Sequence, residues 1–391
     1  MLIDRFFRRV GGTAAPEAKA SRTGPVIAVS AVGRPMWTPR DYGALAREGY
    51  ARNPIVYRSV RTISEAAASV PVLAYRGADE VERHPLLDLI ARPNAGEAGA
   101  SLMEAIYGHL LVAGNAYLEA VSVEGRVREL HALRPDRMKV LPGATGWPEA
   151  FEYTVGGRSV RFSQTGEELP PILHLKLFHP LNDHYGFAPI EAAQVSLDIH
   201  NAAGAWNKAL LDNAARPSGA LVYSGGDGTL TADQFDRLKR ELEEGYQGAR
   251  NAGRPLLLEG GLDWRAMALT PKDMDFIEAK NQAAREIALA FGVPPMLLGI
   301  PGDNTYANYQ EANRAFWRQT VLPLVGRTLA AVGAWLGPTF GEPLRLTFDA
   351  DRVEALSVER DALWRRLEAA SFLSDDEKRA AVGYSPRGEA G

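Results

Sequence analysis

Two patterns of apolar residues alternate along this chain. Spacing of three or four residues, which is typical of an amphipathic helix, occurs in residues 53–70, 101–111, 188–214, 270–292 and 309–329. Residues 115–178 instead contain short apolar segments broken by Gly and Pro, which are typical of strands: AYLEAVSV, MKVLP, FEYTV, SVRFS and ILHLKL. This order predicts an α+β first half and a second half dominated by long helices.

The fourth helical segment carries the clearest boundaries in the chain. Thr270, Pro271 and Asp273 provide a capping hydroxyl, a proline suited to the first helical turn and an acid that favours the helix dipole. Gly292, followed by Val293 and two prolines, is an equally clear end, because glycine adopts the left-handed conformation and proline cannot continue a helix. A helix over residues 270–292 is therefore predicted.

The segment after this helix has two parts. PPMLLGIPGDNTYAN is predicted to be a loop, in which residues 302–308 place small polar side chains around one tyrosine, a composition that suits a core poorly. An ordinary surface connection and a flexible finger that contacts a ligand both remain open. A helical pattern resumes near Tyr309, and Pro323 within it predicts a kink.

A compact β-α-β-β unit is predicted between the third and fourth helical segments. It consists of ALVY, a GGDG turn, a helix from Thr231, and the strand-like PLLLEGG and LDWRAMAL. The outer face of this helix is strongly charged, which is compatible with a solvated surface and equally with a docking surface. Its charged residues are Asp236, Arg237, Lys239, Arg240, Glu243 and Glu244.

Composition limits the classes of protein to consider. Of the 391 residues, 46% are hydrophobic and 24% are charged, which is ordinary globular usage. No uninterrupted apolar run approaches the length of about 18 residues that spans a membrane, so no transmembrane helix is expected. Zero cysteines exclude disulfides and thiolate metal ligands. The net charge of -4 argues against a broad basic surface that grips nucleic acid.

Sequence signatures of enzymes are mostly missing. The chain has no phosphate-binding GxxxxGK[ST] loop and no GxSxG, HExxH or GxGxxG motif, so neither intrinsic catalysis nor a cofactor is expected. One cluster is compatible with zinc or iron, because His174, His179, Asp183 and His184 fall within eleven residues. A metal-dependent hydrolase is therefore one alternative hypothesis. The alternation of His174 with apolar neighbours favours packing in a strand instead.

In their order, these segments resemble the portal family of HK97-like tailed phages from about Trp37 to Pro386. The resemblance rests on NPIVYRSVRTISEAAASVPV, HPLLDLIARPN, GNAYLEA, LHALRPDRMKV, GFAPIEAA, NAARPSGAL and FIEAKNQAAREIALAFGVPPMLLGIPGDNTYANYQEANRAFWRQTVLPL. In its short leader, modest length and Ala- and Arg-rich sequence, the chain is most similar to the portals of alphaproteobacterial gene transfer agents, which are domesticated phage particles.

The resemblance implies an α+β portal fold that assembles into a ring. It also implies a division of the chain into a flexible N-terminal arm (1–35), a wing (36–187), a first stem helix (188–214), a clip (215–269), a second stem helix (270–292), a tunnel loop (293–308), a kinked wing helix with a strand (309–356) and a short crown with the C-terminal tail (357–391).

A function follows from the same resemblance. Portal proteins form a dodecameric ring at one capsid vertex, through which double-stranded DNA enters and leaves. The implied partners are other copies of the chain, the major capsid protein, the terminase large subunit, the head-tail adaptor and the DNA, with no membrane. The implied location is a virion or phage-like particle that assembles in the bacterial cytoplasm. A structural adaptor without a channel is the other alternative.

Two sets of residues receive roles by this resemblance. The tunnel loop is expected to touch DNA through uncharged side chains, which can hydrogen-bond phosphates without the counterion release that lysines cause: Asn304, Thr305, Tyr306 and Asn308. The charged outer face of the helix from Thr231 is expected to dock first the terminase and then the adaptor.

Overall fold

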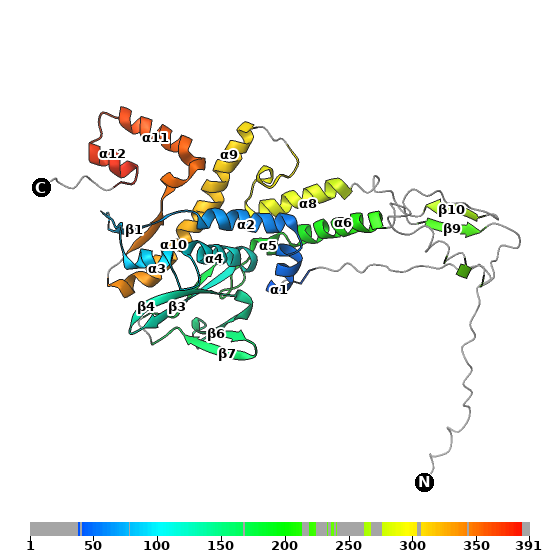
Figure 1. The fold of residues 1–391 in the computed structure, drawn as a ribbon, viewed down its shortest axis with the longest axis horizontal. Coiled ribbons are helices and arrows are strands. Elements are labelled where there is room, and N and C mark those ends of the chain that lie inside the picture. Colours follow the sequence, from blue (N-terminus) through cyan, green and yellow to red (C-terminus); the bar gives the residue numbers. More distant parts are fainter. Residues whose placement is uncertain are drawn as a thin grey trace, which may run out of the picture. The chain divides into compact units, whose positions relative to one another are not determined.

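The computed structural model describes residues 38–39, 41–77, 79–166, 169–212, 219–223, 233, 236–237, 240, 262–266, 276–302, 306–341 and 344–384. The chain divides into two compact units, each described by itself (Figure 1): Trp37–Trp206 with Asp275–Gly391, and Asn207–Met274 with Met1–Met36. The first of these is called the body below.

Three helices form the centre of the body: α2 (Pro54–Ala68), α3 (Pro85–Ala91) and α4 (Gly99–Ala113). A short helix, α1 (Tyr42–Leu45), and a π-helical turn, Ala46–Tyr50, lead into α2. Helix α2 begins after Asn53, whose side chain accepts hydrogen bonds from two backbone N–H groups of its first turn. Helix α4 packs on α2 and ends at Gly114, where a φ of 68° reverses the chain.

Two antiparallel sheets follow α4 in the chain. One has the order β4-β3-β8 and the other β5-β6-β7. Their strands are β3 (Asn115–Val123), β4 (Arg126–Leu133), β5 (Met138–Pro142), β6 (Pro148–Val155), β7 (Arg158–Ser163) and β8 (Ile172–Lys176). The five predicted strand segments are confirmed. Strand β4 was not predicted, because RVRELHAL mixes charged and apolar residues in a strand that is only partly buried.

A third sheet joins the two ends of the body. Strand β1 (Val72–Arg76) pairs antiparallel with β2 (Asp79–Glu80) on one side and with β11 (Arg345–Phe348) on the other. In this register Val72 lies opposite Phe348, so β1 and β11 pair although they lie more than 260 residues apart in the chain. The body is therefore closed by non-local pairing, with α10 (Leu322–Leu336) packed on β11.

The long helix before β11 contains the irregularity predicted from Pro323. Helix α9 (Tyr306–Phe316) passes through a π-helical turn, Trp317–Val321, into α10, and Pro323 lies in the first turn of α10. A turn of 3-10 helix, Gly337–Phe340, follows α10.

In the part of the chain that the structure describes, one helical stretch is long and apolar enough to cross a membrane, judged by length and composition alone. This stretch is Ala307–Phe340, and 56% of its most apolar window is buried inside the structure. Its apolar residues pack in the body, as Leu329 and Leu336 show with exposures of 1% and 0%. The stretch is thus explained as the core helix of a folded domain.

Helices α5 (Pro189–Ala192), α6 (Gln194–Asp212) and α8 (Phe276–Phe291) cover the positions where two stem helices were predicted. The helix is interrupted between α5 and α6 at Ala193, whose ψ of 5° is not helical. The predicted start of the second helix at Thr270 and Pro271 lies outside the described residues. Its predicted end is confirmed, since Gly292 has a φ of 68°.

Polar side chains anchor the first half of α6 in the body. Asp198 accepts hydrogen bonds from the backbone N–H of Thr38, at 3.0 Å, and from its hydroxyl, at 2.5 Å. Asn53 Nδ2 lies 3.0 Å from His200 Nδ1, and the Ser196 hydroxyl donates to Glu286 on α8. Burial, and to a smaller extent the charge of Lys280, lower the pKa of His200, which keeps its imidazole neutral.

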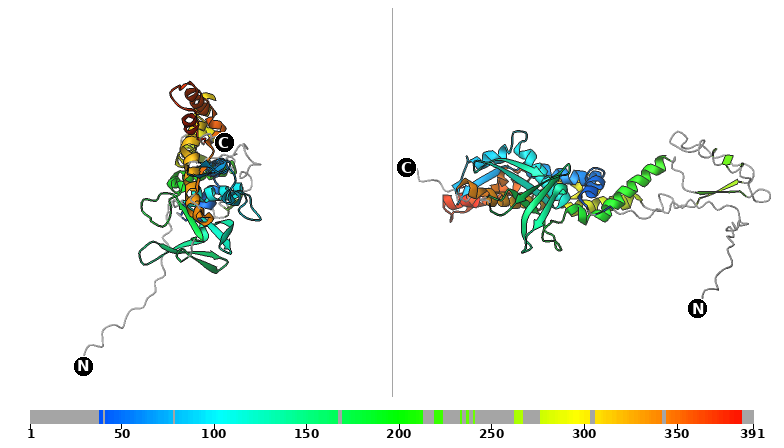
Figure 2. Two further views of the ribbon diagram at one scale, coloured as in Figure 1. Left: turned by 90° about the vertical axis from the view of Figure 1, so that its left-hand side faces the viewer. Right: turned by 90° about the horizontal axis from the view of Figure 1, so that it is seen from below.

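The C-terminal part of the body is a pair of largely exposed helices. After 3-10 turns at Ala350–Arg352 and Glu354–Leu356, the chain forms α11 (Ser357–Ala369) and α12 (Asp375–Ala381). Ser374 begins α12 with a capping box to Glu377. Figure 2 shows these orange and red helices at the opposite end of the body from the β6-β7 hairpin. Neither helix contains a buried residue.

In the second unit, the described residues agree with the predicted β-α-β-β module as far as they extend. Strand β9 (Gly219–Tyr223) pairs antiparallel with β10 (Leu262–Ala266). Asp233, Asp236, Arg237 and Arg240 are helical. The predicted strand PLLLEGG lies outside the described residues.

Candidate functional site

The predicted tunnel loop is firmly attached where it leaves α8. The backbone N–H of Val293 donates to Ala288 O at 2.9 Å, and a 3-10 turn, Pro295–Leu298, follows. Ile300 is 4% exposed and packs with two alanines of α8. The Arg285 guanidinium donates to the carbonyl of Pro301. The loop up to residue 302 is thus a fixed continuation of α8.

Part of the loop prediction is wrong, because α9 begins three residues before the predicted restart at Tyr309. Tyr306 and Asn308, both predicted to lie in the loop, belong to the first turn of α9. Nothing between Tyr306 and Gln310 breaks a helix, and each added residue gains a backbone hydrogen bond once a helix has formed. Asn304 and Thr305 lie outside the described residues.

The first turns of α9 are exposed on all sides. Residues 307–311 are all exposed, and among them only Glu311 is charged. Glu311 accepts a hydrogen bond from Arg314 at 2.6 Å. One turn further on, Arg318 donates to Glu359 of α11 at 3.0 Å and so links α9 to the C-terminal helices. The start of α9 therefore offers an accessible, mostly uncharged polar surface.

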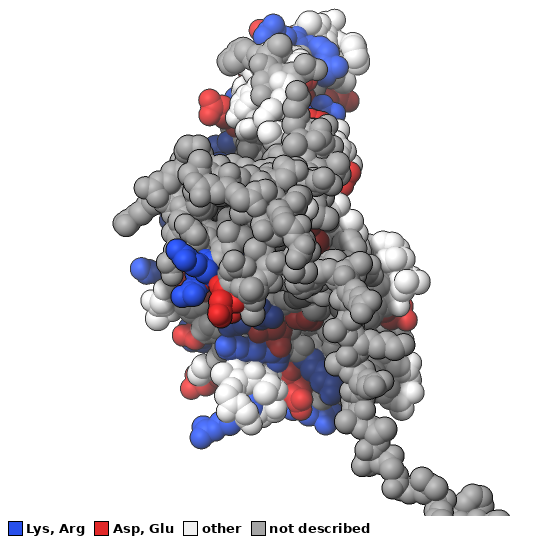
Figure 3. Space-filling model, turned by 90° about the vertical axis from the view of Figure 1, so that its right-hand side faces the viewer, with Lys and Arg blue, Asp and Glu red and all other residues white. Residues whose placement is uncertain are grey.

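The predicted docking surface is described only in part. Asp236, Arg237 and Arg240 are exposed on a helical segment, and Arg240 Nε donates to the Asp236 carbonyl at 3.4 Å. Lys239, Glu243 and Glu244 lie outside the described residues. On the face drawn in Figure 3, the basic and acidic residues among those described are interspersed rather than separated.

The histidine cluster does not form a metal site among the described residues. In that part of the chain, no three His, Cys, Asp or Glu side chains are placed to hold an ion. His174 stacks on Tyr117 with ring centroids 4.4 Å apart, and its Nε2 lies 2.9 Å from Asn115 Oδ1. Burial lowers the pKa of His174 to about 3, with smaller contributions from Lys176 and His184. This histidine is a neutral packing residue of β8.

The other two histidines lie in the loop that follows β8. His179 Nδ1 accepts a hydrogen bond from the backbone N–H of Leu181 at 3.0 Å, which leaves its Nε2 to carry the proton. The backbone N–H of His184 donates to Asn182 Oδ1 at 2.9 Å. These bonds shape the loop.

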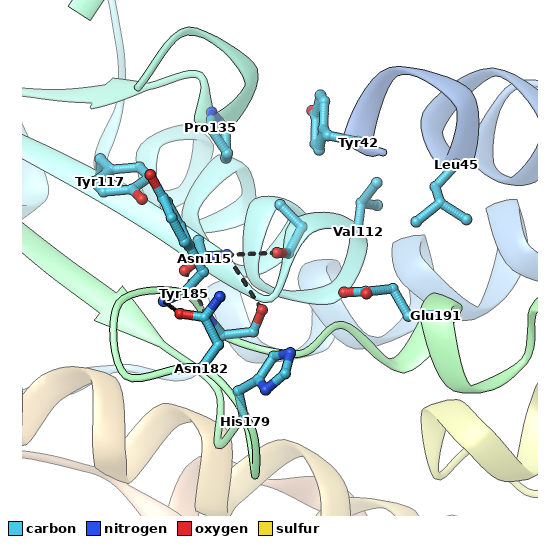
Figure 4. A pocket seen from close by; sticks show the side chains of 12 residues that line it. Tyr42, Leu45, Val112, Asn115, Tyr117, Pro135, His179, Asn182, Tyr185 and Glu191 are labelled. Carbon is cyan, nitrogen blue, oxygen red and sulfur yellow. Dashed lines mark hydrogen bonds between the residues drawn. The ribbon is translucent and has the colours of Figure 1, made fainter. Parts of the chain in front are cut away.

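A pocket of about 280 Å³ lies beside this loop (Figure 4). Tyr42 from α1, His179 from the loop and Glu191 from α5 approach it from three sides. Glu191 Oε1 already accepts the backbone N–H of Ala188 at 2.9 Å. The residues that line the pocket thus include carboxylate, imidazole and phenol groups. The carboxylate of Glu191 and the imidazole of His179 each accept a hydrogen bond from the backbone of their own segment.

Asn115, at the floor of the same pocket, ties the strand to the loop. Its Oδ1 accepts the backbone N–H of Gly186 at 2.8 Å, and its Nδ2 donates to Ala113 O at 2.7 Å. Gly114 and Gly186 meet backbone to backbone there, which leaves no room for a Cβ atom at either position. This junction was not predicted from the sequence. The residues that could have indicated it are the glycine and asparagine of GNAYLEA and the glycine of YGFAP.

Comparisons with known proteins agree on one family. The model of the phage portal protein family matches residues 54–383. An uncharacterized protein of Rickettsia bellii is 42% identical over 339 residues, which are 86% of this chain and 88% of that protein.

Two solved structures extend the comparison. A chain in the neck of a native gene transfer agent particle, computed with C12 symmetry, is 58% identical, with a TM-score of 0.69 over 91% of this chain and 96% of that one. An HK97 family phage portal protein from Corynebacterium diphtheriae is 16% identical, with a TM-score of 0.56 over 83% of this chain and 97% of that one, and shows the fold alone. The predicted fold class and the resemblance to HK97-like portals are confirmed, and the chain belongs to the phage portal protein family.

Proposed function

We propose that this chain is the portal subunit of a gene transfer agent or similar phage-like particle. It would form a dodecameric ring at one capsid vertex, through which double-stranded DNA is packaged and released. The observation that carries this proposal is the 58% identity, across 91% of the chain, to a protein in a particle neck with C12 symmetry. A head-to-tail contact that closes on itself makes such a ring and repeats every lumen residue once per subunit.

The proposed role is structural and requires no catalysis. Its partners would be further copies of the chain, the major capsid protein, the terminase large subunit, the head-tail adaptor and the DNA. The division into wing, stem, clip, tunnel loop and crown that the sequence predicts is kept as part of this proposal. It is supported by the separation of Asn207–Met274 from the body, since the proposed clip lies within that unit.

Within the ring, residues 304–308 would border the channel. Support comes from the start of α9, where Asn308 and its neighbours are exposed and mostly uncharged. Polar, uncharged groups suit DNA that must slide, because they bind phosphate weakly and one at a time. Likewise, the charged face around Arg237 and Arg240 would dock the terminase and the adaptor, supported by the exposure of both residues.

Electron microscopy of the purified chain tests the main proposal. The expected result is closed rings with a central hole, and twelve subunits around the vertex in particles. Monomers under all conditions of concentration and salt would contradict it. Rings of another size in isolation would not, because capsid contacts can select the number.

The two surface assignments need separate tests in producing cells. Replacing Asn304, Thr305 and Tyr306 with Gly and Ser is expected to leave rings intact and to lower DNA content per particle. Reversing the charges of Lys239 and Arg240 is expected to leave rings intact and to reduce packaging. Normal DNA content with intact rings would reject the corresponding assignment.

A further inference from the structure

The carbonyl group at the end of α8 is held by a side chain from another helix. The Thr320 hydroxyl donates to the Gly292 carbonyl at 2.7 Å, although the two residues lie 28 positions apart in the chain. Carbonyl groups at a helix end have no partner inside the helix, so a donor from elsewhere stabilises that end. Thr320 lies in the π-helical turn Trp317–Val321, which forms the base of α9. One hydrogen bond therefore joins the end of α8 to the base of α9.

Glycine at position 292 allows the two helices to approach this closely. A Cβ atom on Gly292 would lie 2.7 Å from Thr320 Oγ1, which is closer than Cβ atoms approach other atoms in proteins. Gly299 has nearly the same φ, 71° against 68°, but no atom lies within 4 Å of the position of its Cβ. Backbone conformation alone thus explains Gly299, whereas Gly292 also makes room for a contact between helices.

The loop that follows α8 is fixed to that helix as far as residue 302. Val293 and Ile300 are only 2% and 4% exposed. The Arg285 guanidinium of α8 donates to the Pro301 carbonyl near the other end of this stretch. Residues 293–302 therefore belong to α8, and the position of α9 relative to them depends on the contacts at its own base.

The start of α9 lies far from that base. The helix spans 11 residues, Tyr306–Phe316, so its start is about 16 Å from the π turn. In Figure 1 this start points away from α2. Residues 307–311 are all exposed. A rotation at the base is therefore enlarged at the start. Of two polar links at the base, the one from Arg318 to Glu359 is an exposed ion pair, which contributes little.

We propose that Thr320 is a positioning residue of the channel. Its hydroxyl holds the base of α9 on the end of α8 and so fixes where the exposed start of α9 stands in the ring. The inference rests on the proposed function, in which the start of α9 borders the channel around Asn308. Because a ring repeats each residue once per subunit, releasing this bond would displace the channel wall at every subunit together.

Hydrogen exchange of the purified full-length chain tests the contact. Thr320→Val keeps the shape of the side chain but removes the donor. It is expected to speed up amide exchange at the end of α8 and in α9 about fivefold, the effect of one neutral hydrogen bond. Thr320→Ser restores the donor and is expected to exchange like the wild type. Gln319→Ala is the matched control, because Gln319 is exposed in the same turn. Wild-type exchange in Thr320→Val would overturn the proposal.

Two glycine variants separate the contact from backbone strain. Gly292→Ala and Gly299→Ala both place alanine at a positive φ, but only the first pushes against Thr320. Gly292→Ala is therefore expected to speed up exchange in α9 about fivefold more than Gly299→Ala does. Equal exchange of α9 in these two variants would also count against the proposal and overturn it.

The DNA content of particles tests the role in the channel. In producing cells, Thr320→Val is expected to leave the number of particles with rings unchanged and to cause a loss of nuclease-protected DNA per particle, whereas Thr320→Ser and Gln319→Ala keep the wild-type amount. Full DNA content in Thr320→Val particles would overturn the positioning role, even with faster exchange. A wild-type chain that is missing from particle necks would instead contradict the proposed function. The exchange results do not depend on it, so the two failures are distinguishable.

Discussion

Helices α4 and α6 differ in how they satisfy their apolar residues. Both are long and both carry apolar residues over much of their surface. Helix α4 buries Leu102, Ile106, Tyr107 and Leu110 against neighbours in the same chain, each at 2% exposure or less. Helix α6 buries one side and leaves Val195 and Ile199 exposed. The centre of the body is thus packed within one subunit, whereas α6 leaves apolar side chains exposed on one side.

Stability measurements on isolated subunits separate these regions, and the largest effect is expected at the tight junction beneath α4. In Gly114→Ala the new Cβ would lie 2.6 Å from the backbone of Gly186, at a φ of 68°. We expect a loss of about 3–5 kcal/mol in the free energy of unfolding, measured with urea, because neither backbone can move aside. Gly125→Ala, at a φ of 74° but with no atom within 4 Å of the Cβ, is expected to lose only about 1 kcal/mol.

The two sides of α6 provide the next comparison. Leu197→Ala is expected to lower the free energy of unfolding of isolated subunits by about 2–4 kcal/mol, because it opens a cavity at a site with 0% exposure. Ile199→Ala, two residues away and 42% exposed, is expected to change it by about 0.5 kcal/mol or less. Equal losses in chemical denaturation of monomers would show that the outer side is also packed within one subunit.

The pH dependence of stability reports on the buried histidines of the body. The folded chain holds the pKa of His109 at about 4 and that of His174 at about 3, in both cases mainly by burial. In the unfolded chain both histidines take up protons near pH 6.5. Their contribution to the free energy of unfolding is therefore complete above about pH 6.5 and is lost as the pH falls towards their pKa values in the folded chain.

Melting temperatures measured from pH 7 to pH 4 are therefore expected to fall, and less steeply in His174→Gln. Glutamine keeps a donor for Asn115 but does not titrate. An unchanged slope in His174→Gln, in a variant that melts like the wild type at pH 7, would show that His174 is not kept neutral by folding.

The smallest effect is expected at the link between α9 and the C-terminal helices. Arg318→Ala removes an ion pair with Glu359 in which both side chains are at least 40% exposed. Such pairs contribute about 0–1 kcal/mol, so thermal unfolding of the body should hardly change. A loss well above about 1 kcal/mol would mean that α11 contributes to the core of the body, in spite of having no buried residue.

The sequence alone determined the helices and strands whose signals are local. Asn53 marks a helix start through its capping side chain, and Gly292 marks a helix end through its left-handed backbone. The five strand segments after α4 alternate or run apolar over short lengths. The order of the motifs also determined the family. The exposure of Val195 and Ile199 on α6 could not be predicted, because a helical pattern alone does not show which apolar side chains find neighbours.

Only the tertiary structure decided which side chains meet. Strand β1 pairs with β11, far away in the chain, and no local pattern specifies such a partner. The histidines near residue 180 are close enough in sequence for a metal site, but β8 buries His174 against Tyr117 while the loop uses His179 to hold its own backbone. Distance along the chain does not fix the direction in which side chains point, and packing against non-local neighbours does.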